Sequence, residues 1–130
     1  MLEEAESFDD AVARLEKQRL AAPCLIGVVG VENDERFIVE RTPTKAALRH
    51  AKGDAPLVVT NHYIAIKHDA PADHLLETSA CARFNRLTEL IASAPMKFGD
   101  ADEGLLYALT APGVIMGITA QHTILRPRDR

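Results

Sequence analysis

The residues best suited to chemistry follow one short apolar run. Residues 56–63 read Pro-Leu-Val-Val-Thr-Asn-His-Tyr, so a β-branched stretch leads into polar and aromatic side chains. The run predicts a buried strand over residues 57–61. An asparagine at a strand end presents an amide donor to a ligand or to a developing oxyanion, which makes Asn61 a candidate catalytic residue. The residues alone favour a plainer role, in which Asn61 caps the strand or starts a turn.

A second candidate group lies on a predicted helix. An apolar stripe at helical spacing predicts an amphipathic helix over residues 79–93, capped by Thr78 or Ser79 and ended by Pro95; its members are Ala80, Phe84, Leu87 and Ile91. Arg83 falls at the edge of this stripe, and Arg86 lies further round. A buried arginine needs a partner because an unpaired buried charge is costly. An ordinary salt bridge, or a stem that covers apolar surface, is the plainer interpretation.

The other reactive side chains give no recognisable site. The spacing of His62, His68, Asp69 and His74 is not that of a helical pair or a closed zinc site. We therefore expect neither a metal nor an organic cofactor.

The two cysteines, Cys24 and Cys81, fit no zinc or redox motif. Both are predicted to be buried, reduced thiols that pack as small hydrophobes. A Cys24–histidine nucleophile is a weaker alternative, because a thiol in an apolar strand resists ionisation.

The bulk composition is that of an ordinary soluble domain. The chain has 130 residues, 47% hydrophobic and 26% charged, which suits a single domain over residues 1–130. A net charge of −4 gives no basic field for nucleic acid. No stretch approaches the roughly 18 apolar residues of a membrane span. The acidic first ten residues do not resemble a secretory signal, so we expect a cytoplasmic protein.

The remaining elements must position these groups. Ser7 and Asp10 form a capping-box pattern that predicts a helix over residues 8–20. Short apolar runs predict further strands, and Asp100 caps a short helix that ends before Pro112; the strand ranges are 25–31, 36–41, 46–51, 114–120 and 123–125. The run over residues 46–51 also fits one helical turn, but a strand is favoured because a segment this short between Pro43 and Gly53 rarely holds a useful helix. The prediction is an α+β chain, with an antiparallel sheet of about five or six strands and two or three helices packed on one face.

The order of three motifs resembles a known superfamily. The motifs are ERFIVERTP, PLVVTNHY and ETSACARFNRL. Together they resemble the C-terminal half of the N-terminal-nucleophile (Ntn) hydrolases, in the branch of the acyl-coenzyme A:6-aminopenicillanic acid acyltransferase-like proteins. Choloylglycine hydrolase, penicillin V acylase and acid ceramidase are relatives in that branch. The resemblance covers about residues 22–126.

The resemblance implies a fold, a chemistry and a set of site residues. It implies the C-terminal portion of the αββα Ntn fold, and hydrolysis or transfer at linear amide bonds. By position, Asn61 resembles the oxyanion-hole asparagine of the family. Arg83, or else Arg86, resembles the arginine that supports the site, and the helical angle favours Arg83. The resemblance also places Thr60, His62, Tyr63 and Arg86 as binding residues around a small acyl-amide ligand.

The chain departs from the family at the nucleophile. The family uses an N-terminal cysteine followed by threonine or serine, whereas this sequence begins Met1-Leu2-Glu3 and Cys24 is followed by Leu25. We therefore expect no hydrolysis by this chain alone, and a complementing N-terminal chain as its partner. The alternative is a non-catalytic binding or assembly domain that self-associates through an exposed sheet face and edge strand. Neither hypothesis involves nucleic acid or a membrane.

Overall fold

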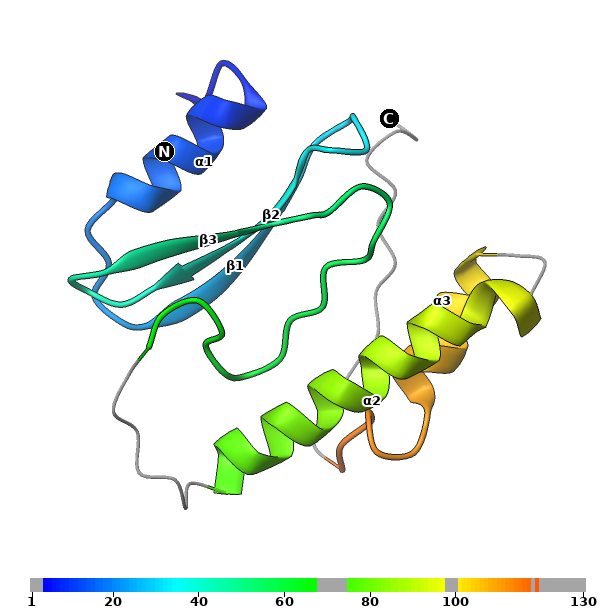
Figure 1. Ribbon diagram of the computed structural model, residues 1–130. Coiled ribbons are helices and arrows are strands. Elements are labelled where there is room, and N and C mark those ends of the chain that lie inside the picture. Colours follow the sequence, from blue (N-terminus) through cyan, green and yellow to red (C-terminus); the bar gives the residue numbers. More distant parts are fainter. Residues whose placement is uncertain (1–3, 68–74, 98–100, 118, 120–130) are drawn as a thin grey trace. The chain divides into compact units, whose positions relative to one another are not determined.

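The computed structural model describes residues 4–67, 75–97, 101–117 and 119 (Figure 1). Contacts divide the chain into two compact units. The described residues of the first unit are 4–59 and 63–67, and those of the second are 60–62 and the residues from 75 onward. The described residues form three helices and one antiparallel sheet, which confirms the α+β class. The single domain over residues 1–130 stays a prediction.

Helix α1, Phe8–Lys17, begins as its sequence predicts. The Ser7 side chain accepts a hydrogen bond from the Asp10 backbone N–H at 3.1 Å and so satisfies one of the free donors of the first turn. The buried side chains of Val12 and Leu15 lie one turn apart on the face that packs. The helix ends three residues before the predicted end at Leu20.

The sheet is an antiparallel meander in the order β1-β2-β3 (Figure 1). Its strands are β1 Cys24–Val29, β2 Arg36–Arg41 and β3 Ala46–His50. These confirm three predicted strands, including the ambiguous third one. The sheet has fewer strands among the described residues than the five or six expected. Helix α1 packs on β2 and β3, with the Phe8 and Phe37 rings 5.2 Å apart.

The turn between β1 and β2 requires a glycine. The Glu35 carboxylate turns back and accepts the backbone N–H groups of Val31 and Glu32 at 2.8 and 3.0 Å. A Cβ atom at Gly30 would lie 2.2 Å from the same carboxylate. Gly30 therefore leaves the space that this turn-closing carboxylate occupies.

The strand predicted over residues 57–61 is wrong. These residues form no strand, and β3 pairs only with β2 within the described part of the chain. Pro56 has no N–H to donate to a ladder. The carbonyl of Val58 instead accepts a hydrogen bond from Arg49 Nη1 at 3.0 Å. A side chain thus takes the place of a neighbouring backbone, and the apolar run lies in an irregular segment.

The second unit is built on two helices, α2 Leu75–Lys97 and α3 Ala101–Thr110, which pack against each other. Its described core consists of small and branched side chains: Ala80, Leu87, Leu90, Ala108 and Ala111. Helix α2 is longer at both ends than the predicted range 79–93. No proline or glycine lies between Pro71 and Ser79, and Pro95 lies in the last turn, where the helix ends two residues later.

The strand predicted over residues 114–120 is also wrong for its described residues. Val114 and Ile115 both donate to the Ala111 carbonyl, at 3.0 and 3.1 Å, so the chain turns directly after α3. Gly113, three residues after the end of α3, has a φ of 84°, a left-handed conformation that suits this turn. The apolar composition of this run does not distinguish a strand from such a turn. The strand predicted at 123–125 lies outside the described residues.

Arg41 joins the sheet to α1. Its side chain is only 4% exposed, and its guanidinium donates to three carbonyls at the C-terminal end of the helix: those of Leu15, Glu16 and Gln18. A cation there also opposes the negative end of the helix dipole. The guanidinium thus satisfies carbonyls that the end of α1 leaves without an intrahelical donor.

Replacing Arg41 should therefore weaken the first unit. Arg41→Met keeps the apolar stem but removes the donors, and hydrogen bonds to a charged group contribute about 1.5–3 kcal/mol each. Because these contributions are not additive and the desolvation of the guanidinium offsets part of them, we expect the free energy of unfolding to fall by about 3 kcal/mol in urea titrations. The control is Arg14→Met, which removes a pair with Asp10 at 2.9 Å whose side chains are both about one-third exposed, and which should cost less than about 1 kcal/mol. Equal losses would contradict this role for Arg41.

Candidate functional site

Asn61 and Arg83 are in direct contact. Arg83 lies on α2, and its Nη2 donates to Asn61 Oδ1 at 2.9 Å. A guanidinium has only donors, so the amide atom that faces it must be the oxygen. The Nδ2 group of Asn61 is therefore directed away from Arg83, on a residue that is exposed. The arrangement fixes the asparagine by its acceptor and presents its donor.

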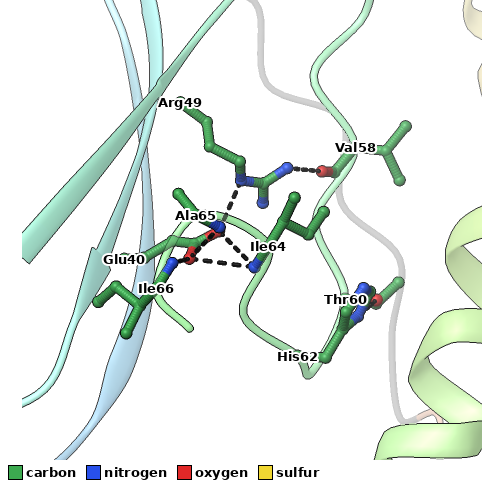
Figure 2. A network of polar contacts seen from close by, with 8 residues as sticks. All are labelled: Glu40, Arg49, Val58, Thr60, His62, Ile64, Ala65 and Ile66. Carbon is green, nitrogen blue, oxygen red and sulfur yellow. Dashed lines mark hydrogen bonds and ion pairs between the residues drawn. The ribbon is translucent and has the colours of Figure 1, made fainter. Parts of the chain in front are cut away.

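The two neighbours of Asn61 contact the same turn of α2. Thr60 Oγ1 donates to the Ala80 carbonyl at 2.9 Å and lies 2.8 Å from His62 Nδ1. The His62 ring meets the Phe84 ring edge-on, with centroids 5.5 Å apart and an interplanar angle of 89°. Figure 2 shows the Thr60 and His62 side chains lying against each other. One helical turn therefore holds three consecutive side chains.

Arg86 lies apart from this group. Its side chain is 47% exposed, and it forms an ion pair with Glu89 at 3.6 Å on the same helix. Of the two arginines considered from the sequence, the structure brings Arg83 to Asn61.

Tyr63 is anchored in the first unit. Its hydroxyl donates to the Arg41 carbonyl at 2.6 Å. Burial is the main cause that raises the pKa of Tyr63 above its ordinary value of 10.0, and the neighbouring Cys24 and Glu40 raise it further. The side chain thus has a structural contact with β2.

A buried carboxylate holds the residues that follow Tyr63. Glu40 of β2 is 0% exposed. Its Oε2 accepts the backbone N–H groups of Ile64, Ala65 and Ile66 at 3.1, 2.9 and 2.9 Å. Figure 2 shows these three nitrogens gathered around the carboxylate. Three consecutive N–H groups on one anion fix the course of this segment, because charge-assisted hydrogen bonds are strong and directional.

Arg49 extends the network to the other side of the segment. Its Nε lies 2.8 Å from Glu40 Oε1, a close ion pair without the alignment of a linear hydrogen bond. Its Nη1 donates to the Val58 carbonyl. Glu40 pairs with Ala47 across the ladder, so Arg49 is its diagonal neighbour on the same sheet face. Glu40 and Arg49 together hold the chain both before and after residues 60–62 (Figure 2).

Sequence reasoning missed Glu40, Arg41 and Arg49. The available signal was a charged pair, Glu40-Arg41, directly after the apolar residues Ile38 and Val39 in a predicted internal strand. Charges at positions buried on both faces need partners. The meander register would have placed Arg49 on the Glu40 face.

The two cysteines differ in their exposure to solvent. Cys24 is half-buried and Cys81 is exposed, both with free thiols, so the prediction that both are buried is wrong for Cys81. Its position on α2 directly after the buried Ala80 turns it to the surface.

His68, Asp69 and His74 lie outside the described residues. Among the described residues, no three His, Cys, Asp or Glu side chains are grouped to hold a metal ion. No helix in the same ranges is both long and apolar enough to cross a membrane.

One comparison with known proteins gives a match. The model of a family described as acyl-coenzyme A:6-aminopenicillanic acid acyl-transferase matches residues 1–105. This range includes every candidate site residue and the Glu40–Arg49 pair. Searches of curated proteins and of solved structures returned no match.

Glu40→Gln should strongly destabilise the protein. The change removes the charge and turns one acceptor into a donor that faces backbone N–H groups, and it leaves Arg49 without its anionic partner. Breaking a buried pair costs about 3–5 kcal/mol, and we expect a loss of that size in chemical denaturation. Glu35→Gln is the matched control, because Glu35 also accepts two backbone N–H groups but does so in an exposed turn. It should cost only about 1 kcal/mol, and similar losses in both variants would refute the special role of burial.

The raised pKa of Tyr63 predicts a loss of stability at high pH. The folded chain holds the hydroxyl proton more firmly than the unfolded chain. The resulting stabilisation is complete below pH 10.0 and is lost as pH rises through the folded-state pKa. Tyrosinate absorbance of the wild type minus that of Tyr63→Phe should show a midpoint above 10.0. A midpoint at or below that value would show that burial does not perturb this hydroxyl.

Proposed function

The chain belongs to the acyl-coenzyme A:6-aminopenicillanic acid acyl-transferase family, and from this we propose that it supplies the oxyanion-stabilising part of a site that cleaves or transfers linear amide bonds. The observation that carries the proposal is the contact between Arg83 Nη2 and Asn61 Oδ1. This contact holds the Asn61 amide by its oxygen, and in the proposal its Nδ2 group donates to the oxyanion.

The chemistry favours a fixed neutral donor at this position. Attack on an amide carbonyl passes through a tetrahedral intermediate in which the oxygen becomes negative. A preorganised N–H donor aimed at that oxygen contributes roughly 3–4 kcal/mol to the lowering of the barrier. Asn61 is fixed through its own oxygen, so its Nδ2 needs no reorganisation when the charge develops.

Arg83 serves as the positioning residue for Asn61. It is half-buried on a turn of α2 that is itself held by the buried Ala80 and Leu87. Because a guanidinium stays charged at all relevant pH values, the contact with Asn61 Oδ1 persists. Its positive charge also favours negative charge on a ligand near Asn61.

The attacking nucleophile is assigned to neither cysteine of this chain. Cys24 lies in β1, within the ladder opposite Arg41, and Cys81 projects from the exposed side of α2. In this proposal, a complementing chain with an N-terminal cysteine provides the nucleophile, and the ligand is a small linear acyl amide. The chain described here contributes Asn61 and Arg83, with Thr60 and His62 beside them.

Reconstitution tests this function. The purified protein is mixed with chains encoded beside it that begin with cysteine, and release of the amine from N-acyl amides is measured. We expect turnover only in the mixture, and Asn61→Ala should lower kcat by about 100- to 1000-fold. Asn85→Ala is the matched control, since Asn85 is an exposed asparagine on α2.

Two outcomes would count against the proposal. Activity of Asn61→Ala within about threefold of the wild type would remove Asn61 as the oxyanion donor. A lack of turnover with every such chain would favour the non-catalytic assembly role instead.

A further inference from the structure

The hydrogen bonds of Thr60 determine where the proton on the His62 ring lies. The Thr60 hydroxyl has one hydrogen and two close polar neighbours, the Ala80 carbonyl at 2.9 Å and His62 Nδ1 at 2.8 Å. A carbonyl oxygen only accepts, so the hydroxyl hydrogen goes to Ala80. The contact with His62 is then a hydrogen bond only if Nδ1 carries a hydrogen and donates it to Thr60 Oγ1.

This arrangement separates the roles of the two ring nitrogens. In neutral imidazole one nitrogen is a donor and the other holds a lone pair. With Nδ1 protonated, the lone pair belongs to Nε2, and further protonation takes place there. The imidazolium form also has a hydrogen on Nδ1, so the bond to Thr60 Oγ1 survives both protonation states.

The ring is held from a second direction as well. Phe84 of α2 packs edge-on against it, and Arg83, the charged residue on the same turn, is engaged with the adjacent Asn61. Protonation at Nε2 would therefore leave in place the contacts that hold Thr60 and the ring.

We infer that Thr60 is a positioning residue that fixes His62 in the Nδ1–H tautomer, and that His62 exchanges protons through Nε2 with the amine of the cleaved amide. The second part rests on the proposed function. As the C–N bond of the tetrahedral intermediate breaks and its C=O bond re-forms, the amine nitrogen takes the Nε2 proton of the imidazolium. His62 is left neutral, with its hydrogen on Nδ1. The thiol that forms the intermediate belongs to the complementing chain.

Nitrogen NMR tests the tautomer directly. Long-range ¹H–¹⁵N correlations of the labelled full chain distinguish a protonated ring nitrogen from one with a lone pair, and His62→Gln assigns the signals. We expect wild-type His62 to carry its hydrogen on Nδ1 at neutral pH. On acidification only the Nε2 resonance should make the large shift. A wild-type spectrum of the Nε2–H form would overturn the inference without any variant.

A matched pair of variants tests the part played by the hydroxyl. Thr60→Val keeps the shape but removes the hydroxyl, and should lose the preference for the Nδ1–H form. Thr60→Ser keeps the hydroxyl and should retain it, a rescue that a purely structural role would not produce. Retention of the tautomer in Thr60→Val would refute the role of Thr60.

The kinetic test and the NMR test can fail independently of each other. In the reconstituted mixture, Thr60→Val should lower kcat with little change in KM, and Thr60→Ser should restore it. A correct tautomer together with unchanged kcat in His62→Gln would overturn the proton-exchange step and leave the oxyanion role of Asn61 intact. Loss of all activity in the mixture would instead count against the proposed function, because the NMR result does not depend on turnover.

Discussion

The first unit depends on one buried anion. Glu40 is fully excluded from water, and its carboxylate is satisfied by three backbone N–H groups and by Arg49. Burying a carboxylate is costly without such partners, so the segment after Tyr63 and the β3 arginine are both required for β2 to hold its place. The segment in turn has no ladder of its own, and the carboxylate supplies what a neighbouring strand would supply. The stability of the sheet and the stability of the adjoining irregular segment are therefore coupled through this one carboxylate.

Local sequence patterns predicted elements that depend on neighbouring residues. They failed where contacts with residues distant in the sequence determine the backbone conformation. The Ser7–Asp10 cap and the first three strands depend on residues close together in the sequence, and the structure confirms the predictions of these elements. Residues 57–61 have the composition of a strand, but a strand needs a partner edge, and the side chain of Arg49 occupies the Val58 carbonyl instead. The run after Gly113 failed for a similar reason, since its first N–H groups return to Ala111. The role of Glu40 was missed because its backbone partners lie about 25 residues away and carry no sequence signal, whereas its side-chain partner Arg49 could have been found from the strand register.

At the candidate site, the sequence predicted the position of one residue but not the directions of the hydrogen bonds. Helical spacing placed Arg83 at the edge of the apolar stripe, and the structure puts its guanidinium on Asn61. The reason is geometric, since Ala80, Arg83 and Phe84 fall on neighbouring positions of one helix face. What spacing does not give is the direction of each hydrogen bond. The Thr60 hydroxyl and the Asn61 amide acquire defined orientations only from the carbonyl and guanidinium they meet. The resemblance suggested which residues to consider, and the polarity of their hydrogen bonds indicates which atoms face each other.

The neighbouring charges of β2 have a consequence for how the strand finds its partners. Glu40 and Arg41 lie on opposite faces, one bound to the irregular segment and the other to the end of α1. A shift of one residue in pairing would exchange the faces of both side chains. The anion would then meet helix carbonyls and the cation would meet backbone N–H groups, each repelled by what it faced. A purely apolar strand tolerates such a slip far better. The Glu-Arg dipeptide therefore penalises a one-residue shift of β2 more heavily than apolar residues at these positions would.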